Sequence, residues 1–212
     1  MPELNERKKR ILSKIYSSQF FRTSDTLKFI ATSLETDTDS LSVELEILSK
    51  DSLLTFREGK PDLTPSGRKE IIVVMVGGSF DIIHPGHIET LEQARSLGDS
   101  LIVSVARDST FRKNKKREPE HNEEMRQKLV SSLRVVDAAV LGSETDIHET
   151  TMLVKPDIVA LGYDQIHDET SIQQELLKRG LQVKVVRLKT SIPEVKTSNL
   201  LKKDNGNLLR GN

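Results

Sequence analysis

From residue 71 onward, short apolar segments rich in β-branched residues alternate with segments that have helical spacing. The apolar segments are IIVVMV (71–76), SLIVSVA (100–106), VDAAVLG (136–142), DIVALG (157–162) and QVKVVRL (182–188). The helical segments are HIETLEQARSLG (87–98), NEEMRQKLVSSLR (122–134), ETSIQQELLKRG (169–180) and KTSNLLKK (196–203). Strands that are apolar on both faces and separated by helices predict an α/β fold, a Rossmann-like parallel sheet with helices on both faces. Ligands then bind beyond the carboxyl ends of the strands.

Residues 1–70 follow a different pattern. The stretches ERKKRILSKIYSS (6–18), SDTLKFIATSL (24–34) and SLSVELEILSKDSLL (40–54) predict three helices. LLTFREG and KPDLTPSGRKE (53–70) predict two short extended pieces around a turn that contains glycine. Three helices and a hairpin resemble a winged helix, a small α+β domain. The sequence thus predicts a winged-helix-like domain over 1–70, a sheet domain over 71–203 and a C-terminal tail over 204–212.

The composition excludes several kinds of function. The 32 lysines and arginines balance the 32 aspartates and glutamates, so no global field draws the protein to nucleic acid or to an anionic membrane. Cysteine is absent, which excludes disulfides, zinc thiolate sites and cysteine nucleophiles. The apolar runs are shorter than the roughly 18 residues of a membrane span. The charged start MPELNERKKR lacks the apolar core of a secretory signal, so we expect a cytoplasmic protein with no membrane partner.

The stretch GGSFDIIHPGH (77–87) follows the first predicted strand of the sheet. Its two leading glycines are expected to let the backbone turn sharply, and Pro85 and Gly86 to tighten the entry to the next helix. His87 then lies in the first turn of that helix, close to His84. Amides at a helix start form an anion site, and two imidazoles aimed into it can donate hydrogen bonds to phosphoryl oxygens. The alternative is a pair of capping or core histidines.

This stretch contains neither the dinucleotide fingerprint nor a Walker loop. It closely resembles the Gly-x-Phe-Asp-x-x-His-x-Gly-His signature of the cytidylyltransferase-like nucleotidyltransferases. The resemblance implies an HxGH nucleotidyltransferase fold for residues 71–203. It also implies that His84 and His87 are catalytic and contact the phosphates of a nucleoside triphosphate. The other motif positions implied to bind nucleotide are Gly78, Ser79, Phe80 and Gly86, and Asp81 is assigned to the acceptor side.

A basic stretch, VARDSTFRKNKKREP (105–119), follows the second strand of the sheet. Such a run is ordinarily a solvated loop. Beside the histidines, however, a mobile basic loop could close over a triphosphate and a phosphate nucleophile and neutralise their charge. The family carries a substrate-binding lysine here, and the resemblance places it at Lys115. It assigns Arg107 and Arg117 to acceptor binding.

Two further segments match the family. EEMRQKLV (123–130) resembles a family helix that has an arginine after a pair of acids, which makes Arg126 a phosphate contact or a structural one. LGYDQ (161–165) follows another strand, in a turn that lies near the base in these enzymes. The resemblance thus places Gly162, Tyr163 and Asp164 in the adenosine pocket, although Asp164 could equally be a helix-entry residue.

The last motif discriminates between relatives. In cytidylyltransferases an arginine is followed closely by Ile-Ser-Thr-Thr, whereas here Arg187 is followed by LKTSIPEVKTS, so that Thr197 and Ser198 come later in the chain. This spacing is similar to that of the archaeal-type FAD synthases, which transfer AMP from ATP to FMN. The resemblance implies that Thr197 and Ser198 hold a β or γ phosphate and that Arg187 binds the acceptor. It also implies a homodimer.

The expected reaction is direct in-line attack of the FMN phosphate on ATP, giving FAD and pyrophosphate. Mg²⁺ is expected to be carried on ATP, with no metal site on the protein itself. One alternative is a CTP-dependent cytidylyltransferase acting on glycerol 3-phosphate or another small phosphoalcohol. Another is a nucleotide-sensing winged-helix transcription regulator. Residues 1–70 contain twelve basic and twelve acidic residues, so DNA binding is not favoured.

Overall fold

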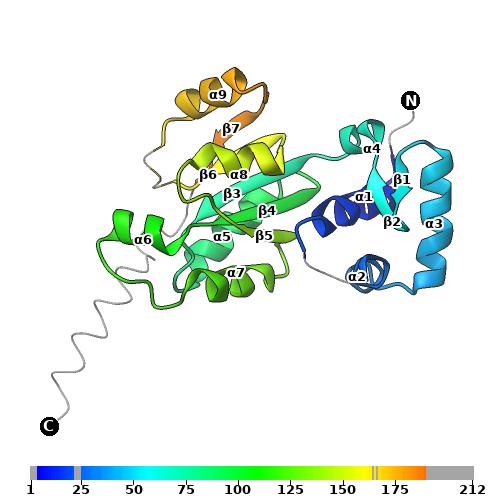
Figure 1. The fold of residues 1–212 in the computed structure, drawn as a ribbon, viewed down its shortest axis with the longest axis horizontal. Coiled ribbons are helices and arrows are strands. Elements are labelled where there is room, and N and C mark those ends of the chain that lie inside the picture. Colours follow the sequence, from blue (N-terminus) through cyan, green and yellow to red (C-terminus); the bar gives the residue numbers. More distant parts are fainter. Residues whose placement is uncertain (1–3, 22–24, 164, 166, 190–212) are drawn as a thin grey trace, which may run out of the picture.

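The computed structural model describes residues 4–21, 25–163, 165 and 167–189 (Figure 1). The N-terminal elements are α1 (Glu6–Ser18), α2 (Thr26–Ser33), α3 (Thr38–Lys50), β1 (Leu54–Arg57), β2 (Lys60–Leu63) and α4 (Pro65–Lys69). β1 and β2 form an antiparallel hairpin. The predicted three helices and hairpin are therefore present, whereas a winged-helix identity for this region stays a prediction.

The rest of the described chain forms a parallel sheet covered by helices. Its strands are β3 (Val73–Gly78), β4 (Ser100–Val105), β5 (Ala138–Leu141), β6 (Ile158–Leu161) and β7 (Lys184–Arg187). Its helices are α5 (Pro85–Arg95), α6 (Asp108–Lys115), α7 (Glu123–Ser131), α8 (Ile147–Val154) and α9 (Glu169–Lys178). All neighbouring strands are parallel, in the order β5-β4-β3-β6-β7, which confirms the predicted fold class. The connections run outward from β3 and β6 in opposite directions, and ligands bind at such a switch point.

Alternate side chains of the central strands enter different parts of the core. Val74, Val76 and Val103 pack with residues of α5 and α7, whereas Met75 and Ile102 belong to the cluster that includes Val154 of α8. In Figure 1, α5 and α7 lie on one side of the sheet and α8 and α9 on the other. This two-residue period is what a sheet buried on both faces requires.

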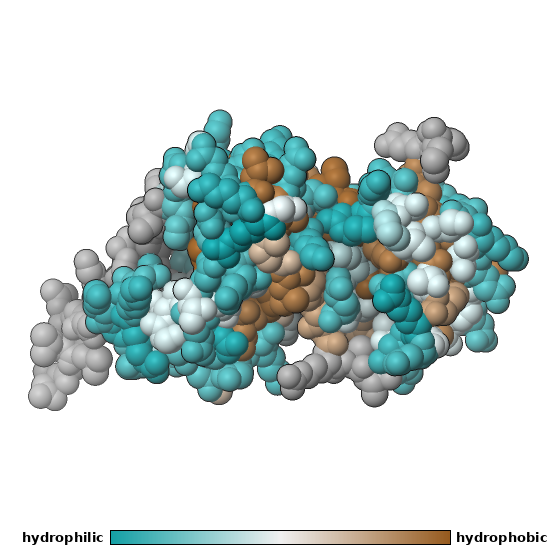
Figure 2. All heavy atoms as spheres, turned by 45° about the horizontal axis from the view of Figure 1, so that its top comes forward, coloured by the Kyte–Doolittle hydropathy of each residue, from teal (hydrophilic) through white to brown (hydrophobic). Residues whose placement is uncertain are grey.

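The N-terminal region packs against the end of the sheet opposite α6 (Figure 1). Ile11, Leu12 and Ile15 of α1 are buried in the same cluster as Met75 and Ile102. In Figure 2 hydrophilic atoms cover most of the visible face, and hydrophobic atoms gather near its middle, where the two parts meet. Because they share a core, residues of α1 contribute to the packing of the sheet.

Polar contacts add to this packing. Lys14 Nζ lies 2.7 Å from Asp137 Oδ1, and Arg68 Nη2 lies 2.8 Å from Asp157 Oδ2. The Tyr16 hydroxyl donates to the carbonyl of Val154, and its ring lies under the Arg68 guanidinium. Burial raises the pKa of Tyr16, which keeps its hydroxyl a donor at neutral pH. Lys14 of α1 and Arg68 of α4 thus bind the residues that directly precede β5 and β6, and Tyr16 of α1 binds the last residue of α8.

Several local predictions are wrong. The backbone does not turn at the two glycines of the histidine motif, because Gly77 and Gly78 are the last residues of β3 and pair with Ser104 and Val105. The basic stretch is not wholly a loop, since its centre forms α6. The segment after β2 is helical and begins with a Thr64 cap, where an extended piece was predicted. Helix α8 was not predicted at all.

Other predictions lie outside the described residues. These are Asp164, Thr197, Ser198, the helix over 196–203 and the tail over 204–212. Within the part of the chain that the structure describes, no helix is both long and apolar enough to cross a membrane.

Candidate active site

The two motif histidines lie together at the start of α5. His84 is the N-cap residue, Pro85 begins the helix, and the His87 amide donates to the His84 carbonyl at 2.9 Å. The two imidazole rings are stacked, with centroids 3.8 Å apart and planes 27° apart. The loop that holds them joins β3 to α5, so both rings lie at the carboxyl end of the first strand of the sheet. The predicted pairing of imidazoles at a helix start is therefore present in the fold.

Phe80 packs beside the His87 ring. It is 2 % exposed, its ring centroid lies 5.2 Å from that of His87, and its backbone has φ +49°, a strained value for a bulky residue. A Cβ at Gly78 would come within 2.7 Å of the Phe80 ring. Gly78 is thus required for close packing of Phe80, which fixes the position of His87.

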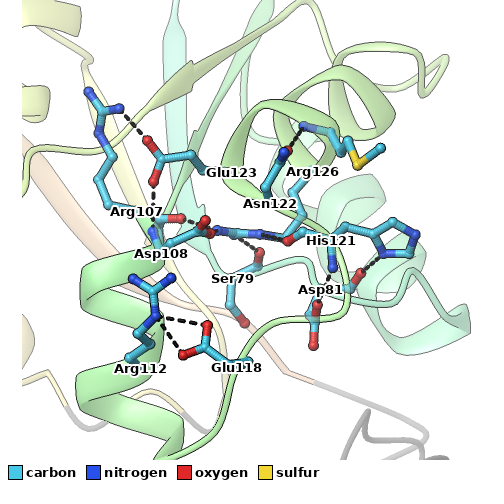
Figure 3. A network of polar contacts seen from close by, with 12 residues as sticks. Ser79, Asp81, Arg107, Asp108, Arg112, Glu118, His121, Asn122, Glu123 and Arg126 are labelled. Carbon is cyan, nitrogen blue, oxygen red and sulfur yellow. Dashed lines mark hydrogen bonds and ion pairs between the residues drawn. The ribbon is translucent and has the colours of Figure 1, made fainter.

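Asp81 is buried and bound by other residues of the chain, and acceptor binding by Asp81 stays a prediction. Its carboxylate accepts hydrogen bonds from Arg117 Nη2 at 2.6 Å and from the Glu120 amide at 2.8 Å, and it is 2 % exposed. His121 Nδ1 lies 3.2 Å from the Asp81 carbonyl oxygen (Figure 3). The Arg117 guanidinium also lies 4.9 Å from the centre of the Phe111 ring. Asp81 therefore holds the end of the basic stretch against the histidine loop.

Arg126 is the most fully buried charged residue of the site, at 0 % exposure. Its guanidinium donates to the Asp108 carboxylate and to three backbone carbonyls, those of Ser79, Ala106 and His121, at 2.5 to 2.9 Å (Figure 3). It therefore joins the ends of β3 and β4 to the start of α7. Of the two roles considered for Arg126, this geometry supports the structural one, and a phosphate contact stays a prediction.

Arg107 and Glu123 form a second connection beside Arg126 (Figure 3). Arg107 Nη1 lies 2.6 Å from Glu123 Oε1, and its Nε donates to the Gly142 carbonyl. Burial alone would raise the pKa of Glu123, but bonds from the Asp108 amide and from Arg107 outweigh it and hold that pKa below its usual value. Glu123 is therefore ionised at neutral pH, and Arg107 is engaged in the fold. Acceptor binding by Arg107 stays a prediction.

The loop after β6 is held by Arg187 and Gln165. Arg187 Nε lies 2.6 Å from Glu169, and its two terminal nitrogens donate to the carbonyls of Gly162, Gln165 and His167. The bond from Arg187 lowers the pKa of Glu169, so this pair is charged at neutral pH. Gln165 Nε2 donates to the Gly77 carbonyl at 2.7 Å. Gln165 thereby bridges β3 and β6 at the switch point, next to the predicted base-binding residues Gly162 and Tyr163.

Lys115 lies at the last turn of α6 and is exposed. The next residue, Lys116, ends the helix in the left-handed conformation, and Arg117 then reaches Asp81. The lysine is therefore held near the histidine loop by a short anchored segment. Arg112 of the same helix pairs with Glu118, so part of the positive charge of this stretch is neutralised locally.

Residues 75–203 match the family model described as cytidylyltransferase-like. The chain belongs to this family. Among its relatives, the FAD synthase of Aciduliprofundum boonei is 53% identical over 119 residues, which cover 56% of this chain and 79% of that protein. The FAD synthase of Thermoplasma volcanium is 47% identical over 133 residues, which cover 63% of this chain and 93% of that protein.

A solved structure agrees with this assignment. The crystal structure of a protein described as a lipopolysaccharide core biosynthesis protein from Thermoplasma volcanium has a TM-score of 0.55 and 49% identity, and the match covers 57% of this chain and 98% of that chain. The predicted resemblance to this family and the predicted enzyme class, a nucleotidyltransferase, are confirmed. The family match begins at Met75 and leaves the N-terminal region outside it.

The sequence prediction missed several residues that build this site. Asp108, Glu123, Gln165 and Glu169 were not singled out, although each binds a predicted site residue or its loop. A signal existed for three of them, because Asp108 opens α6, Glu123 opens α7 and Glu169 opens α9, where acids are favoured by the helix dipole. Their arginine partners lie on other elements, and sequence spacing does not reveal such pairs.

Proposed function

We propose that the protein is an FAD synthase, which transfers AMP from ATP to FMN and releases pyrophosphate. The observation that carries this proposal is the stacked pair His84 and His87 at the start of α5, at the switch point of the sheet. The relatives that share this part of the chain are FAD synthases. The proposed reaction agrees with the spacing of Arg187 and Thr197 in the sequence.

In the proposed mechanism an oxygen of the FMN phosphate attacks the α-phosphorus of ATP in line with the leaving group. The bond from that phosphorus to the bridging oxygen breaks, and pyrophosphate carries the electron pair away. A phosphate monoester is already a nucleophile at neutral pH, so positioning and charge stabilisation supply most of the catalysis. His84, His87 and the Gly86 amide donate hydrogen bonds to the phosphoryl oxygens, since Pro85 has no N–H and the His87 amide already donates to the His84 carbonyl.

The acceptor side is proposed to lie toward α6. Lys115 offers positive charge at the end of that helix, while Asp81, Arg107 and Arg117 act through the fold they hold together. Thr197 and Ser198 are proposed to hold the β or γ phosphate. The base would lie against Gly162 and Tyr163. The loop there is held by Arg187 and Gln165, which would preserve the shape of the pocket.

We further propose that Mg²⁺ arrives bound to ATP. No cluster of three His, Asp or Glu side chains suited to a metal occurs among the residues whose placement is described. Mg²⁺ commonly keeps waters and takes phosphate oxygens with few protein ligands, so the donor set here fits a triphosphate-borne ion. When bound, Mg²⁺ neutralises part of the phosphate charge. A location in the cytoplasm and a homodimer remain predictions.

The test is an assay of ATP and of CTP against FMN, glycerol 3-phosphate and phosphocholine, following pyrophosphate release. We expect release only with ATP and FMN, with FAD as the second product and no release after chelation of Mg²⁺. Turnover of CTP with a phosphoalcohol would replace the proposal by the cytidylyltransferase alternative. No turnover with any pair, together with nucleotide binding, would favour the regulator.

A shortened chain that starts at Lys69 tests what the N-terminal region and the parallel-sheet region each contribute to activity and stability. We expect this chain to keep adenylyl transfer, because every strand of the parallel sheet follows residue 72. We also expect a lower melting temperature, because α1 no longer covers Met75 and Ile102. A folded but inactive product would show that the first residues complete the active site. Titration of the full chain with duplex DNA at two salt concentrations would test the regulator.

A further inference from the structure

Helix α3 exposes apolar side chains on the face that points away from the core. Its inner face buries Leu41, Leu45 and Leu48, as expected for an amphipathic helix. On its outer face, however, Val43 is 60 % exposed and Ile47 is 46 % exposed. In Figure 1, α3 forms the outer edge of the molecule, at the far end from the sheet. The outer face is therefore open to a partner.

The exposed residues of this face form one stripe, which we call the α3 stripe. Since an α-helix turns by about 100° per residue, they fall within an arc of about 100°. They are Asp39, Val43, Glu46, Ile47 and Lys50, and all five are exposed. An acid lies in the first turn, the two apolar residues lie in the middle, and a base lies in the last turn.

We propose that the α3 stripe is the contact surface for a second copy of this chain, with the two helices antiparallel about a two-fold axis. Positions 39 and 50 are centred between residues 44 and 45, and positions 43 and 47 are centred on residue 45. The two centres differ by half a residue, or about 0.75 Å along the helix, so one reversal brings Asp39 close to Lys50 of the second copy and Val43 close to Ile47 of the second copy. Such a self-complementary pattern is what a two-fold interface requires.

The remaining charge of the stripe fits this arrangement. Glu46 precedes Lys50 by four residues, a spacing at which a helical Glu and Lys attract one another. In the pair, Lys50 thus lies between its own Glu46 and Asp39 of the second copy. The contact is small, because a helix of 13 residues is about 20 Å long and an interface of the usual stability buries about 1,200 Å² or more. We therefore expect a weak dimer that forms as the concentration rises.

Nucleic acid fits this surface poorly. The stripe has two acids and one base, whereas DNA binding depends on neutralising phosphates. Several basic side chains of the N-terminal region are also engaged with acids. The ion pairs are Arg7 with Glu44, Lys8 with Asp51, Lys14 with Asp137, Arg57 with Asp62 and Arg68 with Asp157. A second copy matches both the apolar centre and the charges at the two ends.

Helix α7 supplies a matched control. Met125 is 55 % and Leu129 is 44 % exposed, at the same four-residue spacing as the apolar pair of α3. Reversal about residue 127 would put Glu124 opposite position 130, which is the buried Val130. This pair therefore has the exposed apolar area of the α3 stripe without its complementary charges.

The experiment is sedimentation equilibrium of the full chain over a concentration series. We expect the mass to rise toward that of a dimer, Val43→Glu and Ile47→Glu to weaken the dimer at least tenfold, and Leu129→Glu to leave it unchanged. Asp39→Lys should also weaken it, and addition of Lys50→Glu in the same chain should restore it. Circular dichroism melting checks that each variant is folded.

The opposite results would overturn the proposal. They are a monomer at every concentration, a dimer that survives both Val43→Glu and Ile47→Glu, or equal loss from Leu129→Glu. A charge exchange that fails to restore the dimer would also overturn it. Because adenylyl transfer is assigned to the other end of the molecule, its rate is expected to stay unchanged in the α3 variants.

Discussion

At the amino end of the parallel sheet the side chains that bind the strand ends are carboxylates, whereas at the carboxyl end they are arginines and a glutamine. The Asp137 carboxylate accepts from the Leu101 amide at 2.8 Å, and the Asp157 carboxylate accepts from the Val73 amide at 2.7 Å. Asp99 accepts from the amide of Ile72 in the same way. Acceptors thus satisfy the amides with which these strands begin.

The carboxyl end has the opposite requirement. Arg126 donates to the carbonyls of Ser79 and Ala106, just after β3 and β4, and Arg107 donates to that of Gly142 after β5. Gln165 donates to the carbonyl of Gly77 within β3. Buried backbone groups must be paired, so each end of the sheet selects side chains of the complementary polarity.

This difference in polarity explains why the N-terminal region packs at one end of the sheet and the candidate active site lies at the other. Carboxylates at the amino end attract cations, and Lys14 and Arg68 of the N-terminal region supply them. Donors and helix starts gather at the carboxyl end, and there we expect a phosphate to find hydrogen-bond partners. The N-terminal region packs at the amino end of the sheet, and we expect phosphate chemistry at the carboxyl end.

The largest effect on stability is expected when the hydrogen bonds of Arg126 at the carboxyl end of the sheet are removed. Arg126→Ala should lower the free energy of unfolding by about 3–5 kcal/mol, since it leaves Asp108 and three carbonyls without their donor. The control is Arg112→Ala, whose exposed pair with Glu118 should contribute about 1 kcal/mol or less. Urea unfolding measures both. Equal losses would show that burial gives Arg126 no special role.

The next effect concerns catalysis alone. His84→Ala and His87→Ala should each lower kcat/KM by about 10²-fold or more, as loss of one preorganised donor does. Pyrophosphate release gives the rate, and the melting temperature should change little. Near-normal turnover in either variant would defeat the assignment of these imidazoles to the phosphoryl group. Changing an acid of the amino end, such as Asp137, should leave kcat/KM intact.

The amino end should respond in stability instead. Asp137→Ala removes the partner of both Lys14 and the buried Leu101 amide, which should cost about 1–3 kcal/mol. Asp51→Ala is the control, because Asp51 pairs with Lys8 on the surface and should contribute less. Urea unfolding and the transfer assay are run on the same samples. A large loss of kcat/KM in Asp137→Ala would show that the two ends are coupled.

Sequence reasoning located the elements of this comparison better than the contacts between them. The apolar runs predicted all five strands, and Pro85 and Gly86 marked the start of α5, because both signals are local in the chain. The roles of Arg126 and Arg187 depend on carbonyls up to 47 residues away, so no spacing rule reveals them. Helix α8 escaped prediction because its buried positions include Thr150 and Thr151, which weaken the apolar period.

The docking of the N-terminal region was also beyond local patterns. The apolar stripe of α1 predicted a buried face, but not that this face would pack against Met75 and Ile102 of the sheet. A domain boundary near residue 70 describes the change in periodicity, whereas the core does not stop there. Sequence alone treats Asp137 and Lys14 as unrelated surface charges, because their contact spans 123 residues.

The smallest effect is expected at α6, where the carboxyl end meets solvent. Lys115 is two residues from Arg117, which is fixed to Asp81 beside the histidine loop, whereas Lys113 is about 200° away around the helix from Lys115. Both lysines are exposed and have the same charge, so they differ chiefly in direction. Lys115→Ala should therefore reduce kcat/KM about tenfold, and Lys113→Ala clearly less.

The salt dependence of the two variants separates local contact from general attraction. If Lys115 touches a phosphate, the decrease in kcat/KM caused by Lys115→Ala should persist at high salt, because a short contact in a closed site is screened little. If the stretch acts only through its net charge, Lys113→Ala and Lys115→Ala should have equal effects that vanish together as salt rises. That second outcome would show that the basic stretch is only a solvated surface. The anion site would then consist of the α5 start and the two histidines.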